Sequence, residues 1–324
     1  MLSAVQIKSF TSLIKNHKKF VISGHHGPDG DVIGSTLGLV LGLKQLGKTV
    51  LAFNPDGCPQ WLSFLPKSEI IKVKIPNTFK NSILITVDSG DLGRLGNKID
   101  KSFFSEIWNI DHHQSNTRFG KYNFIDVKAG STGQVVFNLL SGFSKFKITP
   151  AIAQNLFCTL STDTGSFRYS NATSDVFALA ALLVKAGAQP DVISQSLYET
   201  YTQRRLKLMH RVLGSLKFEN DGKLAKLYLT QDDLAAVGAG EDESENFVNL
   251  PRGVEGVKIV CFLSEKTSTE WKLSLRARGN TNVLNIATEF GGGGHKLAAG
   301  CTIHGVRAQV EKQLDSVLKT QGHL

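Results

Sequence analysis

The chain has 324 residues, which suggests two domains, and its 41% apolar and 20% charged residues are ordinary for a globular protein and argue against disorder. Thirty-seven Lys and Arg against 28 Asp and Glu give a net charge of +9, which fits anionic partners such as nucleotides, nucleic acid or anionic membranes, although a solvated basic surface is the commoner explanation. Because the sequence has no signal-peptide pattern, no run of 18 apolar residues and only four scattered cysteines, we expect a cytoplasmic protein without a disulfide scaffold.

The first half alternates short β-branched runs with segments of helical spacing. Strands are predicted over 19–23, 48–53, 82–87 and 106–110. Helices are predicted over 32–46, 132–141, 150–160, 172–186, 191–197 and 201–216. Continuous apolar strands separated by helices indicate an α/β fold, with a parallel sheet and helices on both of its faces.

After about residue 216 the pattern changes to short alternating runs. Strands are predicted over 215–219, 224–229, 257–264 and 270–278, and a helix over 283–289. The segment GGGGHKLAAG, another short strand and a terminal helix follow. We therefore expect an α/β domain over 1–190, a helical linker over 191–215, and a smaller mixed α+β domain over 216–324.

Side chains that can bind a metal follow the predicted strands of the first half. In chain order they are His25, Asp29, Asp31, Asp88, Asp111, His112, His113 and, near the end of a predicted helix, Asp163. The loops at the carboxyl ends of parallel strands converge on one crevice, so we expect these side chains to lie close together.

A cluster of carboxylates and imidazoles without cysteine suits Mn²⁺, Mg²⁺, Co²⁺ or Fe²⁺ better than structural zinc. Crowded carboxylates repel one another unless cations neutralise them, and this much negative charge favours two divalent ions. Two ions roughly 4 Å apart that share a carboxylate and a hydroxide are suited to in-line attack on phosphorus. The helix that starts near Val32 also directs its positive end toward a bound phosphate.

The second half carries a candidate anion site. Ser274, Arg276 and Arg278 share one face of a predicted strand, and two arginines can bind a phosphate or a carboxylate through paired hydrogen bonds. A glycine run follows, which allows close backbone approach to an anion; the candidate residues there are Gly292, Gly293, Gly294 and His295.

Four motifs carry a resemblance to a known family. HHGPDGDVIGS, VDSGD, DHHQSN and STDTGSFRYSN, in this order, resemble the motifs of the DHH phosphoesterase superfamily, and GGGGHKLAAG resembles the signature of its companion DHHA1 domain. In length and motif detail the chain is most similar to the NrnA-type group, which hydrolyses short RNA and 3′-phosphoadenosine-5′-phosphate (pAp). The resemblance makes 1–190 a DHH catalytic domain and 216–324 a DHHA1 substrate-binding domain.

The resemblance also implies roles for single residues. Its metal ligands are His25 and Asp29 on one ion, Asp31, His112 and Asp163 on the other, and Asp88 as the bridge between them. It implies that His113 faces the scissile phosphate and that Asp111 orients an imidazole. Arg94 lies near the metal loops by sequence, where it either contacts phosphate or forms a surface ion pair. Two divalent ions, usually Mn²⁺ with Mg²⁺ or Co²⁺ as alternatives, are the implied cofactors.

The implied function is hydrolysis of short oligoribonucleotides to mononucleotides and of pAp to AMP, by water that two metal ions activate. The direction of RNA digestion stays open. Two alternatives also stay open: a phosphodiesterase for cyclic di-AMP or its linear product pApA, and an inactive nucleotide-binding sensor. We expect no membrane and no stable partnership with long nucleic acid, and the resemblance suggests a homodimer.

Overall fold

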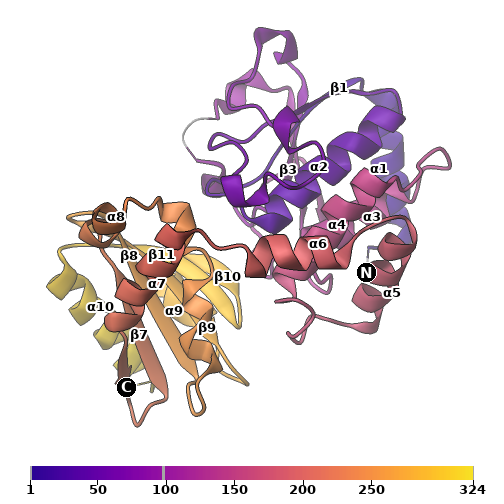
Figure 1. Ribbon diagram of the computed structural model, residues 1–324. Coiled ribbons are helices and arrows are strands. Elements are labelled where there is room, and N and C mark those ends of the chain that lie inside the picture. Colours follow the sequence, from indigo (N-terminus) through magenta and orange to yellow (C-terminus); the bar gives the residue numbers. More distant parts are fainter. Residues whose placement is uncertain (1, 97–98, 324) are drawn as a thin grey trace. The chain divides into compact units, whose positions relative to one another are not determined.

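The computed structural model describes residues 2–96 and 99–323, which form two compact units, Met1–Thr200 and Tyr201–Leu324 (Figure 1). The finer division at residues 190 and 215 stays a prediction. Among the described residues no single helix is long and apolar enough to cross a membrane, although the segments Ser174–Lys185 and Pro190–Glu199 meet that criterion together as a pair bent by 113°.

The first unit is built on a parallel five-stranded sheet in the order β2-β1-β3-β4-β5. Its strands are β1 (Lys19–Ser23), β2 (Thr49–Ala52), β3 (Ile83–Val87), β4 (Glu106–Asp111) and β5 (Tyr122–Ile125). The predicted parallel sheet is thus confirmed, and only β5 was not predicted. The chain turns in opposite directions after β1 and after β3, which makes the gap between their carboxyl ends a switch point where ligands bind in such sheets.

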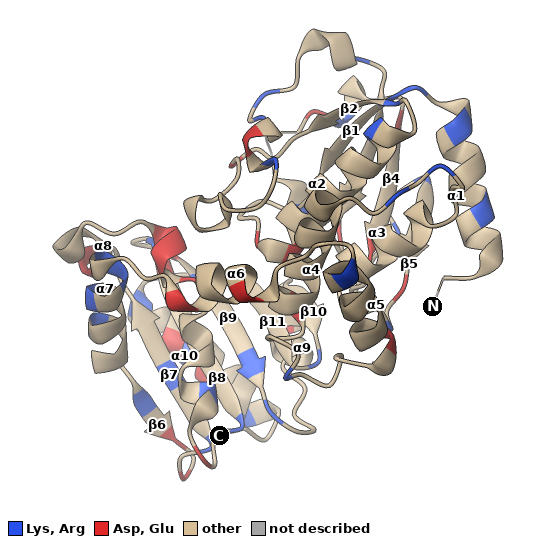
Figure 2. Cartoon of the chain, turned by 45° about the vertical axis from the view of Figure 1, so that its right-hand side comes forward, with Lys and Arg blue, Asp and Glu red and all other residues tan. Residues whose placement is uncertain are grey.

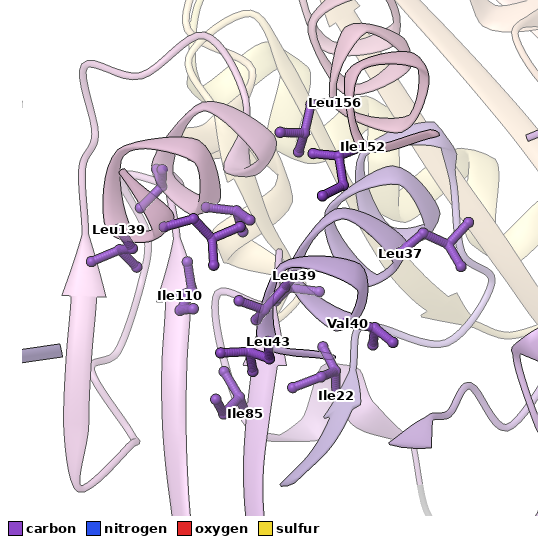
Figure 3. Close-up of a cluster of buried hydrophobic side chains, with 14 of the residues drawn as sticks. Ile22, Leu37, Leu39, Val40, Leu43, Ile85, Ile110, Leu139, Ile152 and Leu156 are labelled. Carbon is purple, nitrogen blue, oxygen red and sulfur yellow. The ribbon is translucent and has the colours of Figure 1, made fainter. Parts of the chain in front are cut away.

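Helices cover one face of this sheet and bury its main apolar core (Figure 3). They are α1 (Ala4–Asn16), α2 (Gly30–Gln45), α3 (Thr132–Leu140), α4 (Pro150–Asp163), α5 (Ser174–Lys185) and α6 (Pro190–Ser194), which continues into a π-helical turn, Gln195–Glu199. Short 3₁₀ helices and loops cover the opposite face, where Leu95 and Phe104 pack on Val21 and Leu84. Both faces are therefore buried, which explains the continuous apolar runs of the strands. Helices were predicted on both faces; the described residues place α-helices on one face, and short 3₁₀ helices and loops on the other.

Glycines let α2 and α4 approach closely. A Cβ atom added at Gly34 would lie 2.5 Å from the backbone oxygen of Asn155 and 2.6 Å from Cγ2 of Thr159. Added at Gly30 or Gly38, one turn away on either side, it would lie 2.4 Å or 2.6 Å from a side chain of α4. This close approach brings the beginning of α2 next to the end of α4, and each of those ends carries a predicted metal ligand.

We expect the Gly34→Ala substitution to destabilise the protein by about 1–3 kcal/mol, because the new methyl group would force backbone atoms of two helices apart. The matched control is Gly214→Ala, since a Cβ atom there meets nothing within 4 Å. That control should be neutral or stabilising by up to about 1 kcal/mol. Urea unfolding curves measure both, and equal free energies of unfolding for the two variants would contradict the close packing of α2 on α4.

The second unit has a mixed six-stranded sheet in the order β10-β11-β9-β8-β7-β6, in which only β7 and β8 pair in parallel. The strands are β6 (Lys217–Glu219), β7 (Leu224–Leu229), β8 (Ile259–Thr267), β9 (Glu270–Ala277), β10 (Gly293–His295) and β11 (Ala298–His304). The helices are α7 (Gln203–Gly214), α8 (Gln231–Val237), α9 (Leu284–Glu289) and α10 (Arg307–Thr320). The predicted α+β composition is confirmed, although α8 and β10 were not predicted.

Candidate metal centre

The predicted metal ligands of the first unit gather at the carboxyl ends of the strands. His25 lies in the loop after β1, Asp88 directly follows β3, and His112 directly follows β4. The first turn of α2 adds Asp31 and the last residue of α4 is Asp163, so two helix ends complete the cluster. The site therefore lies at the switch point between β1 and β3, as the strand order predicts.

One group of donor atoms consists of His25, Asp29 and Asp88, whose ligand atoms lie within 4.8 Å of one another. The His25 Nε2 atom lies 3.9 Å from Oδ2 of Asp29 and 3.7 Å from Oδ2 of Asp88. The opposite ring nitrogen, Nδ1, donates to the backbone oxygen of His26 at 2.8 Å, which fixes the ring with Nε2 toward the carboxylates. Burial, with help from the positive charge of Arg94, lowers the pKa of His25 to about 3, so this imidazole is neutral and can accept a metal.

A second group consists of Asp31, His112 and Asp163. The His112 Nε2 atom lies 2.9 Å from Oδ2 of Asp163 and 3.6 Å from Oδ2 of Asp31. The Nδ1 atom of His112 bonds to the backbone oxygen of Ala129 at 3.2 Å, so this ring also presents Nε2 to the cluster. Both imidazoles are thus oriented by backbone carbonyls, which is typical of histidines that bind metals.

Asp88 lies between the two groups. Its Oδ2 faces His25, whereas its Oδ1 lies 3.6 Å from Nε2 of His112 and 3.6 Å from Nδ1 of His113. The residue has a φ of 55°, a left-handed conformation that is rare outside glycine, so the surrounding fold imposes this orientation of the carboxylate. Burial favours protonation of Asp88, but the charges of His113 and His112 outweigh it, and the net effect lowers its pKa.

The donor set fits divalent cations. Carboxylate oxygens and imidazole nitrogens supply both groups, and all four cysteines are free thiols outside them. Burial and the negative charges of Asp88 and Asp163 raise the pKa of Asp31 well above its ordinary value, because like charges crowd around a carboxylate that has no exposed surface. Cations placed in these groups would relieve that repulsion, which is the physical reason to infer metal binding here.

His113 and Asp111 form a pair beside the two groups. The Nδ1 atom of His113 donates to Oδ1 of Asp111 at 2.7 Å, and the Nδ2 atom of Asn116 donates to Oδ2 of the same carboxylate at 2.5 Å. Asp111 has no exposed surface, and Asn116 is held in turn by Oδ1 of Asn109 at 2.7 Å. Burial opposes the charged form of both groups. The charge of Asp111 nevertheless raises the pKa of His113, and the charge of His113 lowers the pKa of Asp111.

Two side chains from the loop after β2 hold the His25 loop in place, and the sequence analysis missed them. The buried Asn54 donates from Nδ2 to the backbone oxygen of His25 at 3.0 Å. Asp56 accepts the backbone N–H of Gly27 at 2.8 Å. The turn-forming segment Asn-Pro-Asp-Gly was a signal for this loop, but nothing in the sequence pairs it with a loop 29 residues earlier.

The structure places Arg94, which is exposed, in the 3₁₀ turn Gly93–Leu95 after the Asp88 loop. Its backbone oxygen accepts two hydrogen bonds from His26, from the backbone N–H at 2.9 Å and from Nδ1 at 2.8 Å. These two hydrogen bonds keep the Arg94 loop beside the His25 loop. The proximity of its guanidinium is consistent with the lowered pKa of His25.

The first turn of α3 also reaches the cluster, and the sequence analysis assigned it no role. Thr132 donates from its backbone N–H to Oδ2 of Asp31 at 2.7 Å and from its hydroxyl to Oδ1 of Asp88 at 2.8 Å. Gly133 and Ser35 donate to Oδ1 of Asp31 at 3.1 Å and 2.9 Å. Asp31 is thus held at a helix N-terminus, where backbone donors and the helix dipole favour a negative charge.

The candidate anion-binding residues of the second unit lie on and beside β9. Ser274 and Arg276 share its half-buried face, and Arg278 is exposed just beyond the end of the strand. Figure 2 shows Lys and Arg residues in blue on the strands of this unit. Ser274 pairs with Gly300 and Arg276 with Ala298 of the neighbouring β11, so small residues flank the polar face.

The glycine run is part of the sheet. Gly293 to His295 form β10, which pairs with β11. A Cβ atom at Gly292 would lie 2.2 Å from the backbone oxygen of Gly300, and one at Gly294, where φ is 135°, would lie 2.5 Å from that of Ala298. The close approach of two strands therefore requires these glycines whether or not an anion binds there.

Comparison with known proteins agrees with the two-unit architecture. Residues 19–160 match the DHH family, N-terminal domain, and residues 228–321 match the DHHA1 domain. The bifunctional oligoribonuclease and PAP phosphatase NrnA of Thermus thermophilus is 35% identical over 285 residues, which are 88% of this chain and 84% of that protein. The chain belongs to the DHH family of phosphoesterases. The resemblance noted in the sequence is thereby confirmed.

Two further similar proteins extend this comparison. The protein of the same name from Mycoplasma genitalium is 29% identical over 294 residues, which are 90% of each chain. The crystal structure of an exopolyphosphatase-related protein from Bacteroides fragilis superposes with a TM-score of 0.86 at 29% identity, and the match covers 99% of this chain and 97% of that one. The fold of both units is therefore shared with that solved structure.

Proposed function

We propose that this DHH phosphoesterase hydrolyses short oligoribonucleotides to mononucleotides and pAp to AMP. The observation that carries the proposal is the position of Asp88, whose two oxygens face two separate groups of histidine and aspartate ligands. A carboxylate placed in this way suits a pair of metal ions, the arrangement used for displacement at phosphorus. The names of the relatives from Thermus thermophilus and Mycoplasma genitalium support the choice of substrates.

In this proposal six residues hold two divalent ions, with Mn²⁺ preferred over Mg²⁺ and Co²⁺. One ion binds His25 and Asp29, the other binds Asp31, His112 and Asp163, and both share Asp88. When bound, the ions supply a nucleophilic water at neutral pH and a Lewis acid for the phosphate oxygens.

The reaction adds one water across one P–O ester bond. In pAp the 3′-phosphate leaves as inorganic phosphate, and AMP keeps the ribose hydroxyl; in RNA each cleavage releases one nucleotide. Asp111 holds His113 through Nδ1, and in this proposal the protonated ring donates from Nε2 to a phosphate oxygen on which negative charge grows. Arg94 adds a second positive group, and its loop is kept in place by His26.

The DHHA1 unit supplies the binding energy for the nucleotide in this proposal. Arg276 and Arg278 bind a phosphate of the substrate, Ser274 lies on the same strand face, and the segment from Gly292 to His295 approaches the anion through its backbone.

All four cysteines are free, which supports a reducing compartment such as the cytoplasm.

We expect Arg276→Ala and Arg278→Ala each to raise KM by roughly 10–100-fold while kcat and bound metal change little, because a charged hydrogen bond to substrate is worth about 1.5–3 kcal/mol. The matched control is Lys312→Ala on the exposed side of α10 in the same unit, which should leave KM unchanged. Steady-state kinetics with pAp, together with metal analysis, tests this. A parallel loss of bound metal in the arginine variants would contradict the separation of binding and catalysis between units.

A side-by-side turnover assay with Mn²⁺ tests the proposed function. The substrates are end-labelled RNAs of two to five nucleotides, a much longer RNA, pAp, cyclic di-AMP, pApA and pyrophosphate, with the Asp88→Ala variant as control. We expect rapid cleavage of the short RNAs and of pAp, slow cleavage of the long RNA, and no turnover by the variant.

Other outcomes of this assay would overturn the proposal in identifiable ways. Turnover of cyclic di-AMP or pApA alone would assign the same site to degradation of a second messenger. Binding of pAp without hydrolysis, by protein with Mn²⁺ bound, would identify an inactive nucleotide sensor.

A further inference from the structure

Thr132 contacts two of the predicted metal ligands at once. Its backbone N–H lies 2.7 Å from Oδ2 of Asp31, and its hydroxyl oxygen lies 2.8 Å from Oδ1 of Asp88. These two aspartates come from different elements, the first turn of α2 and the loop after β3. Thr132 of α3 therefore links two carboxylates that belong to different elements of the fold.

The hydroxyl contact falls on the oxygen of Asp88 that faces the second ligand group. That oxygen, Oδ1, also lies 3.6 Å from Nε2 of His112, whereas Oδ2 faces His25. Because Thr132 and Asp88 are both buried, water is poorly placed to replace a lost hydroxyl. A hydrogen bond to one oxygen of a carboxylate fixes its rotation, and this rotation decides whether each oxygen faces its own ligand group.

The fold fixes Thr132 independently of any metal. Ser131 caps α3 by accepting the backbone N–H of Gln134 at 3.2 Å, and its hydroxyl also bonds to that of Thr159 in α4 at 3.0 Å. A Cβ atom at Gly133 would lie 2.0 Å from Oγ1 of Thr159, so α3 packs against α4 as closely as a glycine permits. The start of α3 is therefore a rigid support for the two aspartates.

We propose that Thr132 is a positioning residue that sets the rotation of Asp88 and its separation from Asp31, and thereby the spacing of the two metal sites. The inference rests on the proposed function, since it concerns the same carboxylates. It adds a residue from outside the four DHH motifs, with a role that follows from its two hydrogen bonds.

The test uses three variants of the full-length protein with Mn²⁺ as the only added ligand. Thr132→Val keeps the branched shape and the backbone N–H but removes the hydroxyl, and Thr132→Ser keeps the hydroxyl. Ser131→Ala is the matched control, because it removes the cap of α3 and leaves the contact with Asp88 in place. Calorimetric titration gives the affinity for each ion, and electron paramagnetic resonance reports magnetic coupling between two Mn²⁺ ions that share a carboxylate.

We expect Thr132→Val to weaken Mn²⁺ binding by about 10–100-fold and to reduce the coupling signal, while Thr132→Ser stays within about threefold of the wild type. Ser131→Ala should lower the thermal stability but keep both Mn²⁺ affinity and coupling. Wild-type affinity and coupling in Thr132→Val would overturn the inference and leave the proposed function intact. A wild-type protein that neither binds two Mn²⁺ ions nor hydrolyses pAp would overturn both. Equal losses of Mn²⁺ affinity and coupling in Thr132→Val and Ser131→Ala would also overturn the inference, because they would show that Thr132 acts only through the stability of α3.

Discussion

The Asp88→Ala variant should lose at least about a thousandfold in kcat on both pAp and short RNA, because it removes the one carboxylate that faces both ligand groups. The variant should fold, because removal of a buried carboxylate relieves the crowding around Asp31 and so offsets the lost contact with Thr132. Single-turnover kinetics with saturating Mn²⁺ measures the effect on the chemical step.

The matched control for this variant is Asp175→Ala, which removes an exposed carboxylate at the start of α5. That control should keep full activity, since an exposed surface charge outside the ligand groups contributes little. Near-normal activity of Asp88→Ala, with two ions bound per chain, would show that Asp88 is not the bridge.

The second large effect is expected for His113→Ala, with a decrease in kcat of about a hundredfold to a thousandfold and little change in bound Mn²⁺. The reason is that the His113 ring lies beside the two ligand groups and is oriented through Nδ1 by Asp111, and in the proposal Nε2 donates to the substrate. Measured kcat and metal content separate this role from that of a ligand. A loss of one ion per chain in His113→Ala would instead identify this residue as a metal ligand.

The Asp111→Asn variant tests the same pair through the pH profile. The charge of Asp111 raises the pKa of His113, so in the wild type the protonated ring persists to higher pH. Activity that needs the protonated ring is lost as the pH rises through this pKa. Without the charge the pKa falls, and the alkaline limb of kcat should move to lower pH. An unchanged alkaline limb would contradict the role of His113 as a donor.

The sequence predicted the elements whose pattern is local. β1, β3 and β4 are mainly apolar runs, and α2 has helical spacing and ends near a glycine. The predicted positions of all four elements are confirmed within a few residues. β5 was missed because Asn123 interrupts the four residues Tyr122–Ile125, whereas the equally short β2 has no such interruption. β10 was missed because glycines are poor strand formers, and here they serve a close approach to β11.

The metal cluster was predictable because the alternation of strands and helices implies a parallel sheet. Once a parallel sheet is expected, the residues after β1, β3 and β4 must converge, and they do so around Asp88. Their assignment to individual ions stays a prediction. The supporting side chains were not predictable in this way. Thr132 lies 101 residues from Asp31, and Asn54 lies 29 residues from His25, and no motif links these partners.

The central claim is that Asp88 joins two metal sites, and crystals grown with Mn²⁺ and measured at the manganese absorption edge test it most directly. The account predicts two peaks of anomalous density per chain. One lies against Oδ2 of Asp88 beside His25, and the other lies against Oδ1 of Asp88 beside His112. A single peak, or two peaks that share no contact with Asp88, would contradict the proposed two-metal centre.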